Sequence, residues 1–333
     1  MPSEPTPSTV EAGVSPPPKR NFPQQFPDQP SFSTFIKLFW IDILFQLLCA
    51  LSALMIYLFA KPLLPRYFPV YDGMATSAWG LKHGRHFRPE YITTLVSALV
   101  SFFVPVAAVV IVGLCRARSF WDVNAAIMSI GSALAAATLF QALIKWIIGG
   151  LRPNFLAICR PSIPTGMGQI PQWYTANQIC TGDRRMLRDA QMSFPSGHSV
   201  AAFAGFGFLS LYLWDKFRGA SGQDQANAGA PAGHGNEAGA SMAGETSGAT
   251  AGEKDTAAAG KEGAKRTTHW RLVLITLPLL IAFLLSASKV RDGWHHPIDV
   301  VCGALIGTAF ALLAYRLVYR NMRRQGTGQG AAK

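Results

Sequence analysis

The chain has 333 residues, of which 50% are hydrophobic and only 14% are charged. An average soluble protein has about 25% charged residues, so this composition excludes a disordered chain and disfavours an ordinary soluble globule. The formal net charge of +12 comes from 30 Lys and Arg against 18 Asp and Glu. Nucleic-acid-binding domains gather such cations on one polar surface, whereas here they are scattered between apolar segments. We therefore expect a membrane protein without a nucleic-acid partner, although the mean hydropathy is only +0.22.

Six apolar segments follow a Pro-rich N-terminal stretch. Residues 1–34 are rich in Pro, Ser and Thr, which predicts a disordered cytoplasmic tail without a compact signal peptide. A helix needs about 20 apolar residues to cross a bilayer, and only the fourth and fifth segments are short. The segments are residues 38–59, 93–115, 124–148, 199–214, 272–287 and 300–319. We predict an all-α polytopic membrane bundle of six transmembrane helices over residues 35–320, rather than buried helices of a large soluble core.

The connecting segments set the expected orientation. Residues 219–268 are mostly small and polar and predict a flexible cytoplasmic loop, and residues 321–333 form a short basic tail. With both termini in the cytoplasm, a small majority of the 30 Lys and Arg lie on the cytoplasmic side, as the positive-inside rule favours. The loops after the third and fifth segments then share the luminal or extracellular face. Asp42 is a functional candidate by its intramembrane position, but its place near the start of the first segment favours the interface.

Two motifs at this face have the composition of an anion site. Lys145 and Arg152 lie seven residues apart, so they face the same way if the helix persists. Arg offers a bidentate grip on phosphate, but two cations at a helix end are also typical of interface anchors. Ser196, Gly197 and His198 precede the fourth segment, where Ser caps a helix, Gly permits close approach and free N–H groups attract anions. His198 is placed to donate a proton, although simple capping beside a surface His explains this motif equally well.

A third motif precedes the sixth segment. Asp299 lies four residues after His295 at a helix start that Pro297 favours, so its carboxylate reaches back to the imidazole. A carboxylate on one ring nitrogen fixes the tautomer and makes the other nitrogen more basic, which makes His295 a candidate nucleophile. The adjacent His296 points elsewhere and is the weaker candidate. A pair of interface histidines beside a helix-start Asp is the alternative interpretation.

Together these motifs contain what transfer of a phosphoryl group through a phosphohistidine requires. Cations neutralise the phosphate oxygens, one His attacks phosphorus in line, and the other His protonates the leaving oxygen. The motifs hold no carboxylate cluster of the kind that binds Mg²⁺, and their cations would repel a divalent ion. We therefore expect neither a metal nor another cofactor.

The same residues resemble the signature of the phosphatidic acid phosphatase type 2, or lipid phosphate phosphatase, family, including its fungal members. The three parts are Lys145-x6-Arg152-Pro153, Pro195-Ser196-Gly197-His198 and Ser288-Lys289-x5-His295-x3-Asp299. The resemblance implies a six-helix, Mg²⁺-independent phosphatase with a core shared with vanadium haloperoxidases and a site on the non-cytoplasmic face. It implies that phosphate is bound by Lys145, Arg152, Ser196, Gly197 and Lys289. It also implies a general acid, a nucleophile and an orienting carboxylate at His198, His295 and Asp299.

One part of the signature departs from the family pattern, which begins Ser-Arg where this chain has Lys289. Lys keeps the charge but loses the bidentate fork, so we expect weakened activity, with a nearly inactive relative as the alternative. Arg291 would compensate in an extended segment but not in a helix. Residues 87–92, with the sequence Phe-Arg-Pro-Glu-Tyr-Ile, also look like the fungal and animal lipid phosphatases.

The five cysteines divide by position. Cys49, Cys115 and Cys302 fall in or at the edge of apolar segments, where Cys is an ordinary small apolar residue. Cys159 and Cys180 lie in the loop after the third segment. If that loop is luminal, its oxidising environment favours a disulfide over two free thiols.

These observations predict an integral membrane lipid phosphate phosphatase of phospholipid metabolism that acts on phosphatidate, lysophosphatidate or diacylglycerol pyrophosphate. A sphingoid-base or isoprenoid phosphate phosphatase uses the same site and is the alternative. A non-catalytic lipid-binding relative is a further alternative, with Lys289 as its only support. The lipid, the organelle and the oligomeric state are left open.

Overall fold

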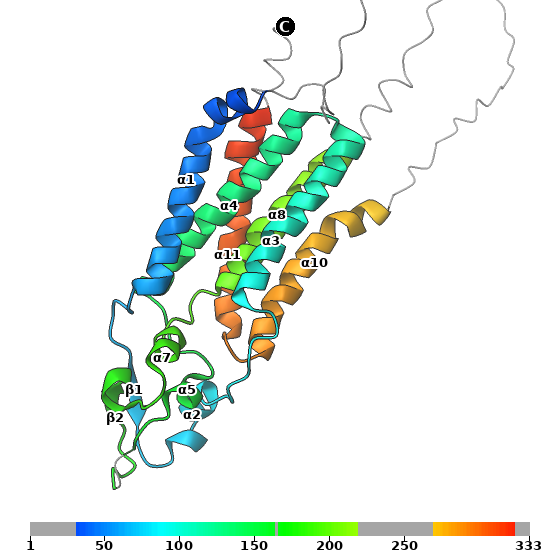
Figure 1. Cartoon of the computed structure of the whole chain (residues 1–333). Helices are drawn as coiled ribbons and strands as arrows, with labels where there is room; N and C mark the ends of the chain where they lie inside the picture. The colour runs from blue at the N-terminus through cyan, green and yellow to red at the C-terminus, as the bar shows by residue number, and fades with distance from the viewer. Residues whose placement is uncertain (1–30, 164–165, 219–268, 324–333) are drawn as a thin grey trace, which may run out of the picture.

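Six long helices account for most of the residues that the computed structural model describes, namely residues 31–163, 166–218 and 269–323 (Figure 1). They are α1 (Phe32–Phe59), α3 (Thr94–Val112), α4 (Phe120–Ile147), α8 (Gly197–Arg218), α10 (His269–Arg291) and α11 (Pro297–Leu313). The π-helical turns η2 (Gly113–Ala117) and η3 (Ala314–Tyr319) continue α3 and α11. Ser31 and Thr93 cap α1 and α3 through their side chains, so these helices begin where local chemistry favours a start.

Five helices in the described part of the chain are long and apolar enough to cross a membrane. They are α1, α3, α4, α10, and α11 with its continuation to Arg323. Large apolar side chains on them, such as Leu48, Phe103 and Leu305, point away from the protein. Exposed apolar surface on helices of this length is what a lipid environment requires. The chain is therefore an integral membrane protein.

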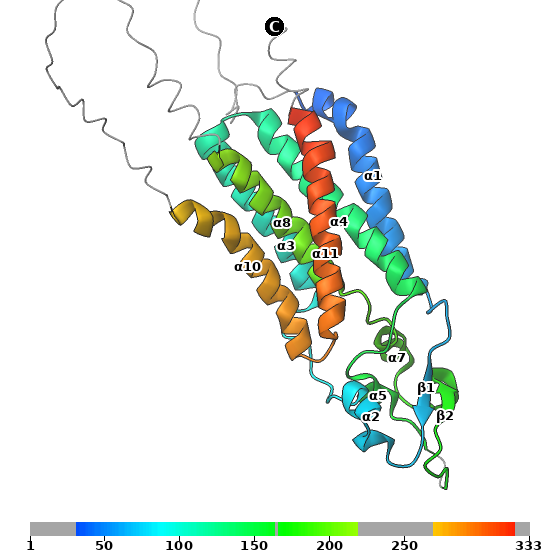
Figure 2. The same ribbon diagram turned by 180° about the vertical axis from the view of Figure 1, so that it is seen from behind.

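The fourth predicted segment forms α8, which is not one of these five helices. It runs through the middle of the bundle and contacts α3, α4, α10 and α11 (Figure 2). Glycines permit the closest approaches: a Cβ on Gly205 would lie 2.0 Å from the carbonyl oxygen of Ser101 in α3. A Cβ on Gly307 of α11 would lie 2.4 Å from the carbonyl oxygen of Val200. Because α8 faces other helices, it needs less apolar character than a helix that faces lipid.

A small region lies beyond one end of the bundle (Figure 1). It pairs β1 (Tyr67–Val70) antiparallel with β2 (Gln172–Thr175) and adds η1 (Met74–Thr76), α2 (Ala78–His83), α5 (Phe155–Cys159), α6 (Ala176–Ile179) and α7 (Arg184–Ala190). Phe68, Phe155 and Leu187 belong to an apolar core of its own. Cys159 and Cys180 are joined by a disulfide, with their Cα atoms 4.7 Å apart. The two-stranded ribbon departs from the predicted all-α class, because two distant loop segments pair along their edges.

The start of α1 and the end of the last helix lie together at the opposite end of the bundle from the small region (Figure 1). Most of the predicted tails, residues 1–34 and 321–333, lie outside the described residues, as does the predicted loop of residues 219–268. Residues 32–34 already belong to α1, and residues 321–323 continue the last helix.

Asp122 lies inside the bundle because α4 begins before the segment that the sequence predicted. Its carboxylate accepts hydrogen bonds from Tyr212 Oη at 3.0 Å and Tyr319 Oη at 2.9 Å, and pairs with Lys216 Nζ at 2.5 Å. These partners come from α8 and η3, so the network ties three elements together at the end away from the small region. Hydropathy marks Asp42 alone as an intramembrane carboxylate and leaves Asp122 outside the third predicted segment.

Candidate active site

A cavity of about 950 Å³ lies where α4 ends and α8 begins, next to the small region. Lys145, Arg152, Gly197, His198 and His295 all line it, so the fold brings the three sequence motifs together. Away from these polar groups the cavity continues between α1, α3 and α4. Apolar side chains line that part, including Leu47, Leu54, Leu95, Phe102 and Leu134.

His295 and Asp299 form a buried pair at the start of α11. Nδ1 of His295 lies 3.7 Å from Oδ2 of Asp299, an ion-pair distance that is longer than a hydrogen bond. The same Oδ2 accepts hydrogen bonds from the Ser193 hydroxyl at 2.5 Å and the His296 backbone N–H at 3.0 Å. Because Asp299 is held on the Nδ1 side, the Nε2 atom is the nitrogen of His295 that is left for chemistry.

Burial decides the charge of His295, whose residue is 2% exposed. Desolvation lowers the pKa of its imidazole to about 3, and the nearby cations Arg152 and Lys145 act in the same direction. The Asp299 carboxylate raises this pKa but does not overcome burial. The ring is therefore neutral near pH 7, as a nitrogen nucleophile must be.

His198 sits at the first turn of α8, and its ring centroid lies 6.4 Å from that of His295. Among the described residues, the buried Nε2 atom of His198 and the buried Ser196 hydroxyl have no hydrogen-bond partner. The Ser196 backbone N–H donates to the Asp299 carbonyl at 3.0 Å, which fastens α8 to α11. Gly197 begins the helix, and a Cβ there would lie 3.3 Å from Oε1 of Gln141. Helix-start N–H groups and an unpartnered hydroxyl suit a bound anion.

Two cations face this helix start. Arg152 donates from Nη2 to the Asp189 carboxylate at 2.8 Å and from Nε to the Asp189 carbonyl at 3.0 Å. Its guanidinium also lies 4.8 Å from the ring centroid of Trp294. These contacts leave the planar group fixed in orientation, which is the condition for a bidentate grip on an anion. Lys145 enters the same cavity from the last turn of α4.

Lys289 takes a different position from these two cations. It is fully buried, does not line the cavity, and donates to the Ile92 carbonyl. Its Nζ atom lies 3.4 Å from Oε2 of Glu90. Residue 291 is helical, and the Arg291 guanidinium stacks 5.4 Å from the centroid of the Tyr91 ring. The compensation by Arg291 that an extended segment would permit is therefore not found.

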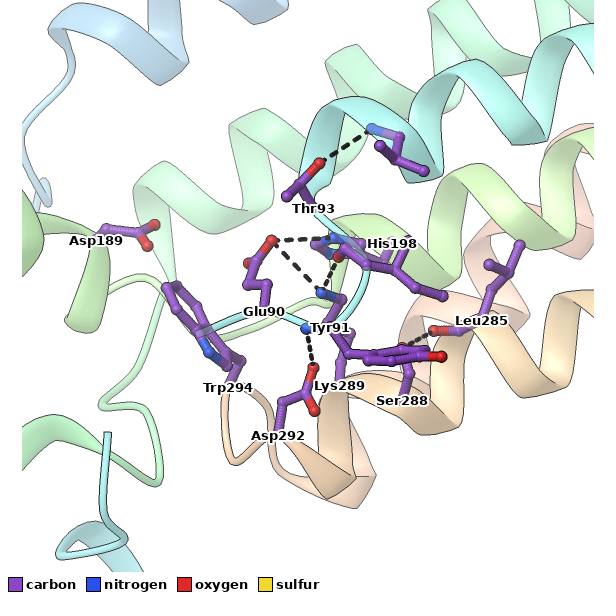
Figure 3. A network of polar contacts seen from close by, with 12 residues as sticks. Glu90, Tyr91, Thr93, Asp189, His198, Leu285, Ser288, Lys289, Asp292 and Trp294 are labelled. Atoms are coloured by element: carbon purple, nitrogen blue, oxygen red, sulfur yellow. Dashed lines mark hydrogen bonds and ion pairs between the residues drawn. The ribbon is translucent and has the colours of Figure 1, made fainter. Parts of the chain in front are cut away.

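The Phe-Arg-Pro-Glu-Tyr-Ile stretch brings Glu90 into the site (Figure 3). Trp294 Nε1 donates to the Arg88 carbonyl at 2.8 Å, and the Tyr91 N–H donates to Oδ2 of Asp292 at 2.9 Å. Both contacts dock this stretch on the third motif. The resemblance of this stretch to lipid phosphatases predicted no role for Glu90.

Two further polar residues, Ser193 and Asp189, belong to the site, whereas His296 lies outside it. Ser193 and Asp189 are not predicted from the sequence, because their roles depend on contacts with residues far along the chain. His296 points to the small region, where its Nε2 lies 3.2 Å from the Leu151 carbonyl and its ring packs on that of His83. In the described part of the chain, no group of three or more His, Cys, Asp or Glu is arranged to hold a metal ion.

The fold and the cavity define a class: helical membrane proteins in which two histidines, two cations and a helix start line one cavity. Residues 126–323 match the PAP2 superfamily, and this chain belongs to that superfamily. All three motifs of the predicted signature lie within the matched residues, which confirms the resemblance.

Several curated relatives are similar to the chain. Lipid phosphate phosphatase 2 of Arabidopsis thaliana is 30% identical over 65% of this chain and 58% of its own length. A Schizosaccharomyces pombe protein named probable diacylglycerol pyrophosphate phosphatase 1 is 27% identical over 85% of this chain and 84% of its own length. Diacylglycerol pyrophosphate phosphatase 1 of Saccharomyces cerevisiae is 26% identical over 69% and 65%. The chain thus spans less than two thirds of some relatives. No solved structure matches it.

Proposed function

We propose that this protein is a Mg²⁺-independent lipid phosphate phosphatase that hydrolyses phosphatidate, lysophosphatidate or diacylglycerol pyrophosphate. The observation that carries the proposal is a single cavity with a phosphate-binding composition at one end and an apolar lining at the other. The names of the plant and fungal relatives support the same substrate class.

The polar end of the cavity binds the phosphate group. Lys145 and Arg152 neutralise its oxygens, and the Ser196 hydroxyl and the Gly197 N–H at the start of α8 donate hydrogen bonds. Lys289 acts on the phosphate site only indirectly, through Glu90, because its ammonium contacts Glu90 and lies outside the cavity lining. A trigonal-bipyramidal phosphoryl group gains charge on these oxygens, so cations placed in advance lower the barrier.

The two histidines divide the chemistry. Nε2 of His295 attacks phosphorus, while Asp299 keeps the proton of the ring on Nδ1 and stabilises the charge that develops. His198 protonates the oxygen of the leaving lipid and later accepts a proton from the water that hydrolyses the phosphohistidine. The neutral state of His295, which follows from its lowered pKa, makes it ready to attack near pH 7.

The apolar part of the cavity holds the lipid chains. Its lining comes from α1, α3 and α4, three of the helices that are apolar enough to cross a membrane. A lipid there keeps its chains in an apolar environment while its headgroup reaches the histidines. A soluble sugar phosphate has no group that would fill this space, so we assign a lipid substrate.

We also propose that α8 is a sixth span and that both termini face the cytoplasm. α8 is 22 residues long and runs alongside four of the five apolar helices, so it crosses the same thickness of bilayer. An even number of spans puts the start of the first span and the end of the last span on the same side of the membrane. The cation count in the connecting segments favours the cytoplasm for that side, with the cavity on the luminal or extracellular face.

Phosphate release from short-chain phosphatidate in detergent with excess EDTA tests the function. We expect release that EDTA leaves unchanged and that His295→Ala abolishes, with Cys115→Ala as a control on an exposed residue outside the cavity. Parallel assays with a sphingoid-base phosphate and an isoprenoid phosphate rank the alternative substrates. The absence of release from every lipid phosphate, or release that survives in His295→Ala, would refute the proposal.

A further inference from the structure

Glu90 is a carboxylate inside a cavity otherwise suited to an anion. Its Oε2 atom lies 3.8 Å from Nε2 of His198 and 3.4 Å from Nζ of Lys289, and its side chain is 15% exposed. Figure 3 shows it pointing at both groups from the segment before α3. A negative group beside a phosphate opposes binding, so its presence calls for a compensating role.

The position of Glu90 is fixed by its neighbours in sequence. The carbonyl of Arg88 is held by Trp294, the N–H of Tyr91 by Asp292, and the carbonyl of Ile92 by Lys289. Three backbone contacts within five residues leave the carboxylate little freedom to swing away from His198. Its approach to His198 is therefore fixed by the docking of this segment on Lys289, Asp292 and Trp294, which lie just before His295 in the chain.

Positive groups face His198 from the other packed elements. They are Lys145 of α4, Arg152 of the segment after it and Lys289 of α10, whereas the His295 ring, which faces His198 from the loop before α11, is neutral near pH 7. Each of the three cations disfavours the imidazolium that a general acid must be before it donates. The carboxylates of Asp189 and Asp299 are engaged with Arg152 and with Ser193. Glu90 is the carboxylate that the structure pairs with His198.

We propose that Glu90 is the positioning residue of the general acid: it stabilises the His198 imidazolium, as Asp299 orients His295. This inference rests on the phosphatase function proposed above. Because Glu90 faces Nε2, the proton that His198 transfers is the one on Nδ1. In the first step an N–P bond forms at Nε2 of His295, the ester P–O bond breaks, and the Nδ1 proton moves to the leaving oxygen.

The second step restores the acid. A water oxygen bonds to phosphorus, the N–P bond to His295 breaks, and a proton of the water returns to Nδ1 of His198. Inorganic phosphate leaves, and Glu90 again faces an imidazolium. Both steps balance without any group other than substrate and water.

Lys289 has a place in the same arrangement. Its ammonium contacts Oε2 of Glu90 and the Ile92 carbonyl, so it holds the carboxylate in position. A compact ammonium serves these two acceptors, and the bidentate fork of Arg brings no advantage there. The Lys at this position and the carboxylate of Glu90 therefore form one unit that acts on His198.

The dependence on the leaving group separates this role from a structural one. Full-length wild type, Glu90→Gln and Glu90→Asp are assayed in detergent on short-chain phosphatidate, whose alkoxide needs a proton, and on p-nitrophenyl phosphate, whose phenolate does not. General acid catalysis contributes about 100-fold or more, so we expect Glu90→Gln to lose about that factor in kcat on phosphatidate. On the nitrophenyl ester we expect a loss of less than about tenfold, with partial recovery of phosphatidate turnover in Glu90→Asp.

The pH profile gives an independent measurement. On phosphatidate, the alkaline limb of kcat reports loss of the His198 proton, and Glu90→Gln moves it to lower pH. Asp72→Asn, the same chemical change at an exposed carboxylate outside the cavity, leaves both substrates and the limb unchanged. Equal losses on both substrates with an unmoved limb would overturn the role of Glu90. A wild type that cleaves neither substrate would overturn the phosphatase function itself.

Discussion

Ser193 donates its hydroxyl proton to Oδ2 of Asp299 at 2.5 Å, across 106 residues of sequence. This contact joins the loop before α8 to the first turn of α11, and it fixes the carboxylate that faces His295, the proposed nucleophile. The contact with His295 alone does not fix the Asp299 carboxylate, because the 3.7 Å between Nδ1 of His295 and Oδ2 of Asp299 is beyond hydrogen-bond range. The second acceptor contact of Asp299, from the backbone of His296, completes the restraint.

Ser193→Ala should therefore slow the reaction without weakening substrate binding. Loss of one hydrogen bond to a buried carboxylate costs about 1.5–3 kcal/mol, so we expect kcat to fall about tenfold or more with KM nearly constant. Ser286→Ala is the matched control, because that buried hydroxyl bonds within its own helix, to the Ala282 carbonyl at 2.8 Å. A change in KM with kcat unaltered would contradict the assignment.

His198→Ala should trap the covalent intermediate. With p-nitrophenyl phosphate the leaving group needs no acid, so His295 still attacks, but the water that resolves the phosphohistidine has lost its base. We expect a stoichiometric burst of nitrophenol and a protein-bound phosphate that survives base and is lost in acid. His295→Ala should show neither the burst nor the label. A label of the same size in His295→Ala would place the nucleophile elsewhere.

The Lys289–Glu90 pair predicts a non-additive effect on stability. Lys289→Met leaves a mostly buried Glu90 without its cation, which costs on the order of 3 kcal/mol when one partner of a buried pair is removed. Glu90→Gln in the same chain removes the stranded charge. We expect the double variant to have a higher Tm in detergent than Lys289→Met alone, measured by thermal unfolding. Additive losses in the double variant would mean that the two side chains do not interact.

Stability should fall in mild acid because of two buried histidines outside the membrane-spanning helices. Burial lowers the pKa of His83 to about 4 and that of His295 to about 3, from 6.5 for an exposed side chain. Below pH 6.5 the unfolded chain binds protons at both positions before the folded protein does. Each group therefore destabilises the fold as the pH drops from 6.5 towards its folded pKa, by about 1.4 kcal/mol per pH unit, and has no such effect above 6.5.

Tm measured between pH 7 and pH 5 checks this slope. His83→Gln keeps a side chain that can bond to the Trp79 carbonyl but does not titrate, so its Tm should fall less steeply than that of wild type. His86→Gln, at an exposed position of the same segment, should leave the slope of the wild type. Parallel slopes for wild type and His83→Gln would mean that His83 is protonated in the folded protein.

Local sequence patterns predicted the helices and the three motifs because both depend on nearby residues. Hydropathy marks the five apolar helices directly, and Pro297, Ser196 and Gly197 mark where two helices begin. The α8 segment is the instructive exception. Its weak apolar character reflects a central position among α3, α4, α10 and α11, which no local pattern reports.

The sequence by itself determined the chemistry that the site can perform: two histidines, a carboxylate four residues after one of them, and cations at a helix end. Only the tertiary structure decided which groups serve these residues, because those groups lie far away along the chain. Glu90 reaches His198 and Lys289, Ser193 reaches Asp299, and Asp122 reaches Tyr212 and Tyr319 by helix packing alone. Motif spacing reports the i to i+4 geometry of one helix, whereas burial and pairing of charges depend on how six helices pack together.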